Sequence, residues 1–331
     1  MISRQFISKI FAFFVGLCCV YIAYEFNSKS NTVLSGSIYG TTWTISSSDY
    51  ISDYHQVNIN KILNSVDSVA SNYKDTSEVS IINIKPLNNY FEISDELTEL
   101  ITTAEIVKNQ SNGFYDITLG KISASKGFSP DFGLDLSDYV EAGNTKYELK
   151  TNKLIKYQDF WFDMSSIAKG FAVQQIHDYL ISNDLTNHLI DIGGEVIING
   201  TNKSNAWVIG IQDPRNQLDK PFFLVSNDKS NFLAIATSGE YRNYRYDNDK
   251  LVTHTFDPFT KKSISGNLES ITIISQNSAT IADAYATAVN VMGFERGLDF
   301  VNTNGIAALF IINEEGELKS IKSQKWYDLE L

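Results

Sequence analysis

Cysteine is nearly absent from this sequence of 331 residues. The only two, Cys18 and Cys19, lie in an apolar stretch close to the N-terminus. The rest of the chain therefore contains no disulfide and no thiolate metal site, and thiol chemistry is excluded from its active site. Such a body is compatible with an oxidising compartment.

Positive charge and chain-breaking residues are also scarce. The 27 Lys and Arg residues are outnumbered by 39 Asp and Glu residues, the formal net charge is -12, and the basic residues form no stripe. This balance excludes a nucleic-acid-binding surface, which needs clustered positive charge. Only 5 Pro and 19 Gly occur, and 12% of the residues are aromatic. We therefore expect regular elements joined by tight turns.

The N-terminus carries a long apolar run. Arg4 and Lys9 precede an uncharged stretch at 10–24, which has the length of a signal-peptide core and comes close to that of a spanning helix. We assign residues 1–30 to a signal peptide or membrane anchor and residues 31–331 to a catalytic body. Cleavage, lipidation at one of the cysteines and retention all remain open. In each case the positive residues stay in the cytoplasm, which predicts an inner-membrane protein whose body faces the periplasm or the cell exterior.

Periodic apolar positions predict an α+β body. Apolar residues recur every three or four positions between Asn58 and Tyr73, which indicates an amphipathic helix, and a second helix is expected from about Ser94 to just before Gly113. Further helices are expected at 167–180 and 281–292, and strands at 42–46, 207–211, 233–236, 271–274 and 306–312, with two strands about a Gly-Gly turn at 189–198. No repeat and no linker divides the body, so we expect one mixed sheet-and-helix catalytic unit behind an N-terminal apolar helix.

Asp283 and Thr287 are spaced for metal binding. They stand four residues apart in a predicted helix, so both oxygens project from one face. A carboxylate and a hydroxyl, completed by carbonyls, water and substrate phosphates, are typical magnesium ligands. A capped helix start would account for the same pair without a metal.

The segment 161–170 passes from an apolar strand into the start of a helix. Backbone N–H groups at such a start bind phosphate, and Lys169 would add positive charge beside it. A capped surface helix with a solvated lysine is the alternative.

Two other segments combine aromatic and polar residues. In 111–118, the aromatic side chains either line a flat ring, while Asp116 accepts a hydrogen bond, or pack in the core. A polar hairpin contains His254 beside Asp257, and His254 is the natural proton acceptor there. A lone histidine is also common in a purely structural role.

In their order these segments resemble the FAD:protein FMN transferases, the ApbE family, over nearly the whole body. Gly40 to Trp43 looks like the opening M-G-T-x-Y/W, Ser77 to Asn83 like S-E-x-S-x-x-N, and Gly113 to Thr118 like G-x-F-D-x-T, followed by Gly127-Phe128. The remaining motifs are Asp163 to Gly170 for D-x-x-x-x-A-K-G, Asp191 to Glu195 for the G-G-D/E turn, Thr237 to Tyr241 for T-S-G-D/E-Y, His254 to Pro258 for H-x-x-D-P, and Ala282 to Thr287 for A-D-A-x-x-T.

The resemblance implies a set of site residues in an ApbE-like α+β fold. FAD would be contacted by Tyr39, Tyr73, Phe114, Tyr115, Asp116, Asp163, Lys169 and Thr255. Magnesium would be held by Asp283, Thr287 and the backbone oxygen of Ser166, and His254 would be the base, with Asp257 orienting it.

Several positions depart from the family pattern. Tyr39 replaces the usual Met, and Gln174 stands where Asp often follows A-K-G-x-A-x. Phe259 and Lys261 replace Arg and Gly in D-P-R-T-G-x-P. Tyr39 and Gln174 concern the flavin pocket. Phe259 and Lys261 alter the loop beside the expected base and therefore bear on target recognition.

The reaction that the resemblance implies is magnesium-dependent transfer of FMN from FAD to a threonine or serine hydroxyl of a target protein, with release of AMP. Family targets are subunits of membrane redox pumps, which suits a membrane-attached enzyme. Two alternatives use the same residues: a magnesium-dependent FAD pyrophosphatase that yields FMN and AMP, and a flavin-binding carrier without turnover.

Overall fold

The computed structural model describes residues 4–29, 31–134, 136, 146–215, 220–240, 244–247 and 250–330. Its helices are α1 (Arg4–Lys29), α2 (Asp53–Ala70), α3 (Glu78–Asn83), α4 (Asp95–Gln110), α5 (Gly120–Ser125), α6 (Ala168–Ser182), α7 (Ala279–Met292), α8 (Phe294–Thr303) and α9 (Gln324–Asp328). Its strands are β1 (Thr32–Ile38), β2 (Thr41–Ser47), β3 (Tyr90–Glu92), β4 (Tyr147–Lys150), β5 (Lys153–Lys156), β6 (His188–Ile192), β7 (Glu195–Asn199), β8 (Val208–Ile211), β9 (Phe223–Ser226), β10 (Phe232–Gly239), β11 (Tyr244–Asp247), β12 (Lys250–Thr253), β13 (Leu268–Ser275), β14 (Ala307–Glu314) and β15 (Glu317–Lys322).

An eight-stranded antiparallel sheet forms the centre of the body, in the order β1-β2-β6-β7-β10-β13-β14-β15. Two of its tight turns require positive φ. Gly193 and Gly194, at +63° and +102°, join β6 to β7, and Tyr39 and Gly40, at +54° and +73°, join β1 to β2. Glycine adopts this conformation without strain, whereas Tyr39 does so at a cost. Both turns reach the same cavity, described below.

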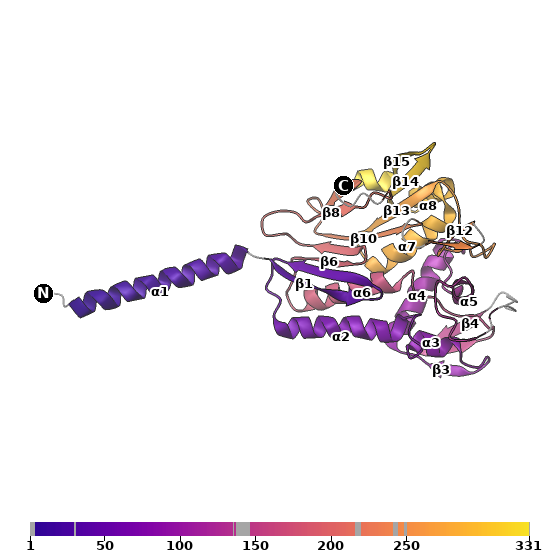
Figure 1. Cartoon of the computed structure of the whole chain (residues 1–331), viewed down its shortest axis with the longest axis horizontal. Helices are drawn as coiled ribbons and strands as arrows, with labels where there is room; N and C mark the ends of the chain where they lie inside the picture. Colours follow the sequence, from indigo (N-terminus) through magenta and orange to yellow (C-terminus); the bar gives the residue numbers. More distant parts are fainter. Residues whose placement is uncertain are drawn as a thin grey trace.

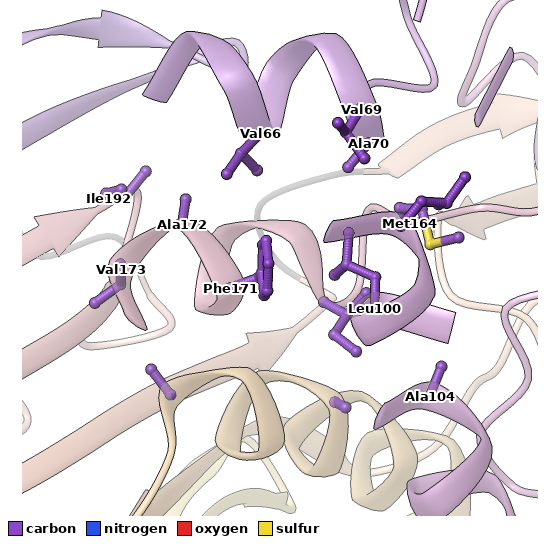
Figure 2. Close-up of a cluster of buried hydrophobic side chains, with 14 of the residues drawn as sticks. Val66, Val69, Ala70, Leu100, Ala104, Met164, Phe171, Ala172, Val173 and Ile192 are labelled. Carbon is purple, nitrogen blue, oxygen red and sulfur yellow. The ribbon is translucent and has the colours of Figure 1, made fainter. Parts of the chain in front are cut away.

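Helices cover one face of the sheet (Figure 1). The helix α6 packs on β6 and β7, and α2 packs on α6 and α4. In the buried apolar cluster that joins these layers, Val66, Leu100 and Phe171 point toward one another (Figure 2). The helix α7 packs on β10 and β13 through a second cluster, which α8 extends. On the other face, the β8–β9 hairpin and α9 cover β7, β10, β13 and β14. In this arrangement the start of α6 packs against α7.

Most of the expected elements are present, and the α+β architecture is confirmed. The helix expected from Asn58 begins at Asp53, and α4 begins after Ser94, whose Oγ accepts the N–H of Leu97. Only the apolar strand expected at the start of 161–170 is wrong. Residues 161–164 belong to no strand, and the Phe162 backbone is hydrogen-bonded to Asn side chains instead. Neither β15 nor α8 was predicted from the sequence: β15 is largely exposed and shows little apolar alternation, and α8 is a short helix of 10 residues.

The N-terminal helix α1 extends away from the body (Figure 1). The side chains described at 11–22 are exposed. Among the helices that the structure describes, none is both long and apolar enough to cross a membrane.

Candidate active site

A cavity of about 820 Å³ opens where the loops after α4, the start of α6, the end of β10 and the face of α7 meet. Ligand pockets in proteins are typically about 300–1,000 Å³. Twelve predicted site residues line it: Tyr39, Tyr73, Phe114, Tyr115, Asp116, Asp163, Ser166, Lys169, His254, Thr255, Asp283 and Thr287. Only Asp257 does not. Segments spread over most of the body therefore converge on one cavity.

Asp283, on α7, is the buried acid of the cavity. It is 3% exposed, and its Oδ2 accepts the N–H of Gly170 at 2.9 Å. Burial raises the pKa of this carboxyl, and the ammonium group of Lys169 opposes the rise. A carboxylate placed in this way is stabilised by any further cation that enters the cavity. The N–H groups at the start of α6 were expected to bind phosphate. In the structure, the N–H of Gly170 donates to the Asp283 carboxylate instead.

The other oxygens predicted for magnesium come from two segments. Thr287 lies one turn after Asp283, and its Oγ1 is 3.5 Å from Oγ of Ser238 on β10. Ser166 precedes α6, and its hydroxyl is 3.0 Å from Oη of Tyr115. In the part of the chain that the structure describes, no group of three or more His, Cys, Asp or Glu is placed to hold a metal. Because magnesium is often held by one or two carboxylates together with substrate phosphates, these hard oxygens fit it.

Lys169 forms an ion pair on the cavity wall. Its Nζ lies 2.6 Å from Oε2 of Glu195, the first residue after the Gly-Gly turn. Glu195 is buried, whereas the Lys169 side chain is 30% exposed. The alternative of a solvated surface lysine is therefore wrong. The ammonium group is held where an anionic ligand in the cavity can reach it.

Asp163 is positioned by two asparagines from distant parts of the chain. Asn83 accepts the N–H of Phe162 at 2.7 Å and donates to its carbonyl at 2.9 Å. Asn72 donates to the same carbonyl and accepts the N–H of Met164, both at 2.7 Å. These bonds fix the backbone on both sides of Asp163, so its carboxylate is presented to the cavity from a rigid loop.

The Ser77 to Asn83 motif is explained by this scaffolding role. Ser77 caps α3 by accepting the N–H of Ser80, and its hydroxyl donates to the carbonyl of Ser71 at 2.6 Å. The Glu78 carboxylate accepts the N–H and the hydroxyl of Ser94 and so joins α3 to the start of α4. The motif thus supports the cavity wall from behind.

Asp116 is held ionised between two lysines. Its Oδ2 lies 2.9 Å from Nζ of Lys108 and 3.4 Å from Nζ of Lys146, and its Oδ1 accepts the N–H of Thr118. Burial raises the pKa of this carboxyl, but the two ammonium groups and the Thr118 hydroxyl outweigh it and lower the pKa to about 2. Asp116 is therefore a hydrogen-bond acceptor at any physiological pH.

Aromatic side chains form part of the cavity wall. Tyr39 donates its hydroxyl to the carbonyl of Leu63 at 2.7 Å, which fastens the β1–β2 turn to α2. The largely exposed Tyr73 donates to the carbonyl of Phe128 at 2.7 Å. Burial raises the pKa of both Tyr39 and Tyr115, so these phenols stay neutral. Flat neutral rings of this kind suit an aromatic ligand.

His254 lines the cavity, whereas Asp257 does not. His254 is the only histidine that lines the cavity, and its ring lies 6.4 Å from that of Phe128. Oδ1 of Asp257 accepts the N–H groups of Phe259 and Thr260, at 2.7 and 3.3 Å. Asp257 therefore shapes the turn that follows His254. That it orients the imidazole stays a prediction.

Arg245 is a cavity residue that the sequence motifs did not indicate. Its guanidinium carbon lies 5.4 Å above the Phe128 ring, and a Cβ on Gly127 would come within 2.6 Å of its Nη1. Gly127 in the Gly127-Phe128 motif was the one sequence signal for this contact, because a side chain there would clash with Arg245. Tyr241, in the Thr237 to Tyr241 motif, lies outside the described residues.

Comparison with known proteins gives consistent matches. The ApbE family model matches residues 39–310. An FAD:protein FMN transferase from Vibrio cholerae is 30% identical over 311 residues, covering 88% of this chain and 91% of the relative. Another from Haemophilus influenzae is 31% identical over 302 residues, covering 85% and 86%. The solved structure of the flavin transferase ApbE from Vibrio cholerae has a TM-score of 0.77 at 28% identity, covering 90% of this chain and 99% of that one.

Proposed function

The chain belongs to the ApbE family, and from this premise we propose that it transfers FMN from FAD to a threonine or serine hydroxyl of a target protein and releases AMP. One observation carries the proposal. The cavity joins a buried acid, an anchored ammonium group, flat aromatic walls and a histidine. These are the groups needed to hold a flavin dinucleotide and to move one proton.

The reaction is a phosphoryl-type transfer. The acceptor hydroxyl oxygen forms a bond to the phosphorus on the FMN side of FAD, the bond from that phosphorus to the bridging oxygen breaks, and AMP leaves with that oxygen. His254 takes the hydroxyl proton. No covalent enzyme intermediate is required, so the chain contributes mainly positioning and electrostatic stabilisation.

Each group of this chain has an assigned task in that step. Lys169 pairs with the pyrophosphate, and Asp163 and Asp116 accept hydrogen bonds from polar groups of FAD. The rings of Tyr39 and Phe114 exclude water from the flavin. Thr255, next to the base, contacts FAD from the β12 side.

Asp283, Thr287 and the backbone oxygen of Ser166 would hold magnesium. When bound, the ion neutralises negative charge that builds up on the pyrophosphate. Burial raises the pKa of the Asp283 carboxyl, and a cation bound beside it would lower that pKa again by stabilising the carboxylate.

The test is to incubate the body with FAD, magnesium and a candidate acceptor, then to run a denaturing gel. A flavin-fluorescent acceptor band is the expected result. Free FMN and AMP without a labelled band would instead identify an FAD pyrophosphatase, and unchanged FAD would identify a carrier.

We further propose that the N-terminal residues attach the protein to the inner membrane and that the body faces outward, where it would meet redox-pump subunits as acceptors. The apolar run after Arg4 and Lys9 supports this arrangement. Protease added to intact spheroplasts should digest the body. Digestion only after lysis would place the body in the cytoplasm.

A further inference from the structure

A solvent-exposed phenylalanine stands beside the candidate active site. Phe259 is 60% exposed and does not line the cavity, although its neighbour Pro258 and the expected base His254 do. We propose that Phe259 and Arg296 form a docking surface for the acceptor segment of the target protein, with an apolar side chain of that segment on Phe259 and a carboxylate on Arg296. This inference rests on the proposed transfer to a protein hydroxyl.

The turn that carries Phe259 is rigid. Oδ1 of Asp257 accepts the Phe259 N–H at 2.7 Å, and the Asp257 backbone exchanges hydrogen bonds with Lys261 and Lys262 at 2.8 and 2.9 Å. Lys261 has a φ of +59°, a strained conformation for a lysine. The chain thus holds a large apolar ring in solvent at a fixed place. Fixed, exposed aromatics are typical anchors of protein interfaces.

Phe114 connects this ring to the cavity. The rings of Phe114 and Phe259 meet edge to face, with centroids 5.0 Å apart and planes at 66°. Phe114 also lines the cavity, and the Arg296 guanidinium carbon lies 4.7 Å from its ring centroid. Three separate segments, namely the loop after α4, the turn after β12 and α8, therefore meet at the edge of the cavity. In Figure 1, α4, α8 and β12 lie at the end of the body opposite to α1.

Arg296 supplies a charge that the occupant can match. It is exposed, and no described carboxylate lies within ion-pair distance of it. Its guanidinium group also contacts the Phe114 ring, so its charge is held at the edge of the cavity. In a chain of net charge -12, such a group favours an acidic side chain near the acceptor hydroxyl.

The position of the surface identifies the occupant as the acceptor and not FAD. In the proposed function FAD occupies the cavity, which Phe259 does not line. The acceptor hydroxyl must reach His254, only five residues before Phe259 on the same segment. A bound acceptor segment would therefore cross Phe259 and Arg296 on its way to the base.

The experiment measures initial rates with a soluble acceptor domain, the threonine-bearing domain of a redox-pump subunit, at saturating FAD and magnesium. We expect Phe259→Ala to raise the KM for the acceptor about tenfold, the usual order for an interface aromatic, and Phe259→Tyr to stay near wild type. Affinity for FAD, measured by flavin fluorescence, should be unchanged in both. Tyr327→Ala, an equally exposed aromatic on α9, is the matched control.

A charge exchange tests Arg296. Arg296→Glu should raise the KM for acceptor domains that carry Asp near the threonine, and acceptor domains with Lys at that position should restore it. Lys325→Glu on α9, the matched control, should leave the KM unchanged for both kinds of acceptor domain. Two results would overturn the docking surface while the wild type still transfers FMN. One is an unchanged KM for the acceptor in Phe259→Ala and Arg296→Glu, and the other is a loss of FAD affinity that parallels the rise in KM. Absence of transfer by the wild type would overturn the proposed function itself.

Discussion

At the scale of single residues, Asp283 is a buried carboxyl that contacts the first turn of α6. Asp283→Asn should abolish transfer and keep the fold, because the amide oxygen can still accept the Gly170 N–H while the negative charge is lost. Rates should be measured against magnesium concentration, alongside thermal unfolding. A normal rate at limiting magnesium would contradict the metal assignment.

His254 is expected to be the base. An alcohol is a poor nucleophile, and an imidazole nitrogen can take the proton of its hydroxyl group. His254→Ala should slow transfer by about 10²–10⁴ and leave FAD binding nearly normal. Single-turnover rates and fluorescence titration check the two parts.

The other three histidines serve as controls. His55 Nδ1 lies 2.8 Å from the Tyr179 hydroxyl, and His177 and His188 bond each other. None of the three lines the cavity. A loss of FAD affinity in His254→Ala with a normal rate at saturation would make His254 a flavin contact.

At the scale of elements, the contact between α6 and α7 sets the geometry of the candidate site. A Cβ on Gly170 would lie 2.5 Å from the carbonyl oxygen of Ala279 and 2.6 Å from Cβ of Asp283. Gly170→Ala should therefore push α6 away from α7, lower the free energy of unfolding by about 1–3 kcal/mol and weaken magnesium-dependent transfer.

Chemical denaturation and transfer assays measure both effects. Gly266→Ala is the matched control, since no atom lies within 4 Å of the added Cβ. Equal stability of the two variants would show that α6 and α7 do not need this close approach.

At the scale of the whole molecule, a buried histidine pair predicts a loss of stability in acid. His188 Nδ1 donates to the Leu185 carbonyl, so its Nε2 accepts from His177 Nδ1 at 2.9 Å. Burial and then His177 lower the pKa of His188 to about 4, although the hydrogen bond to the Leu185 carbonyl and then Asp49 act in the opposite direction. A proton on Nε2 would break the bond between the two rings.

The sign follows from this lowered pKa. Between pH 6.5 and about 4 the unfolded chain binds more protons than the folded one, so the stabilisation is complete above pH 6.5 and is lost as pH falls through about 4. The loss should approach about 3 kcal/mol. Denaturation at pH 7 and pH 4 measures it, and His188→Gln should show a smaller difference between the two pH values. An identical difference would assign the acid sensitivity to other groups.

The sequence by itself determined the local elements and the chemical identity of the candidate site. Periodic apolar residues located α2 and α4 because burial of one face imposes a three- to four-residue spacing. Ordered motifs identified the family, and twelve of the thirteen site residues named from them line one cavity. The strand β15 was not predicted, because it is largely exposed and its sequence has little apolar alternation.

The tertiary structure decided everything that depends on contacts between distant segments. Sequence spacing does not show that Asn72 and Asn83 hold the backbone beside Asp163, or that Lys169 meets Glu195. It also does not show that Asp257 bonds its own turn. These partners are brought together only when the helices pack on the sheet, because their positions follow from the burial of the whole apolar core and not from any local pattern.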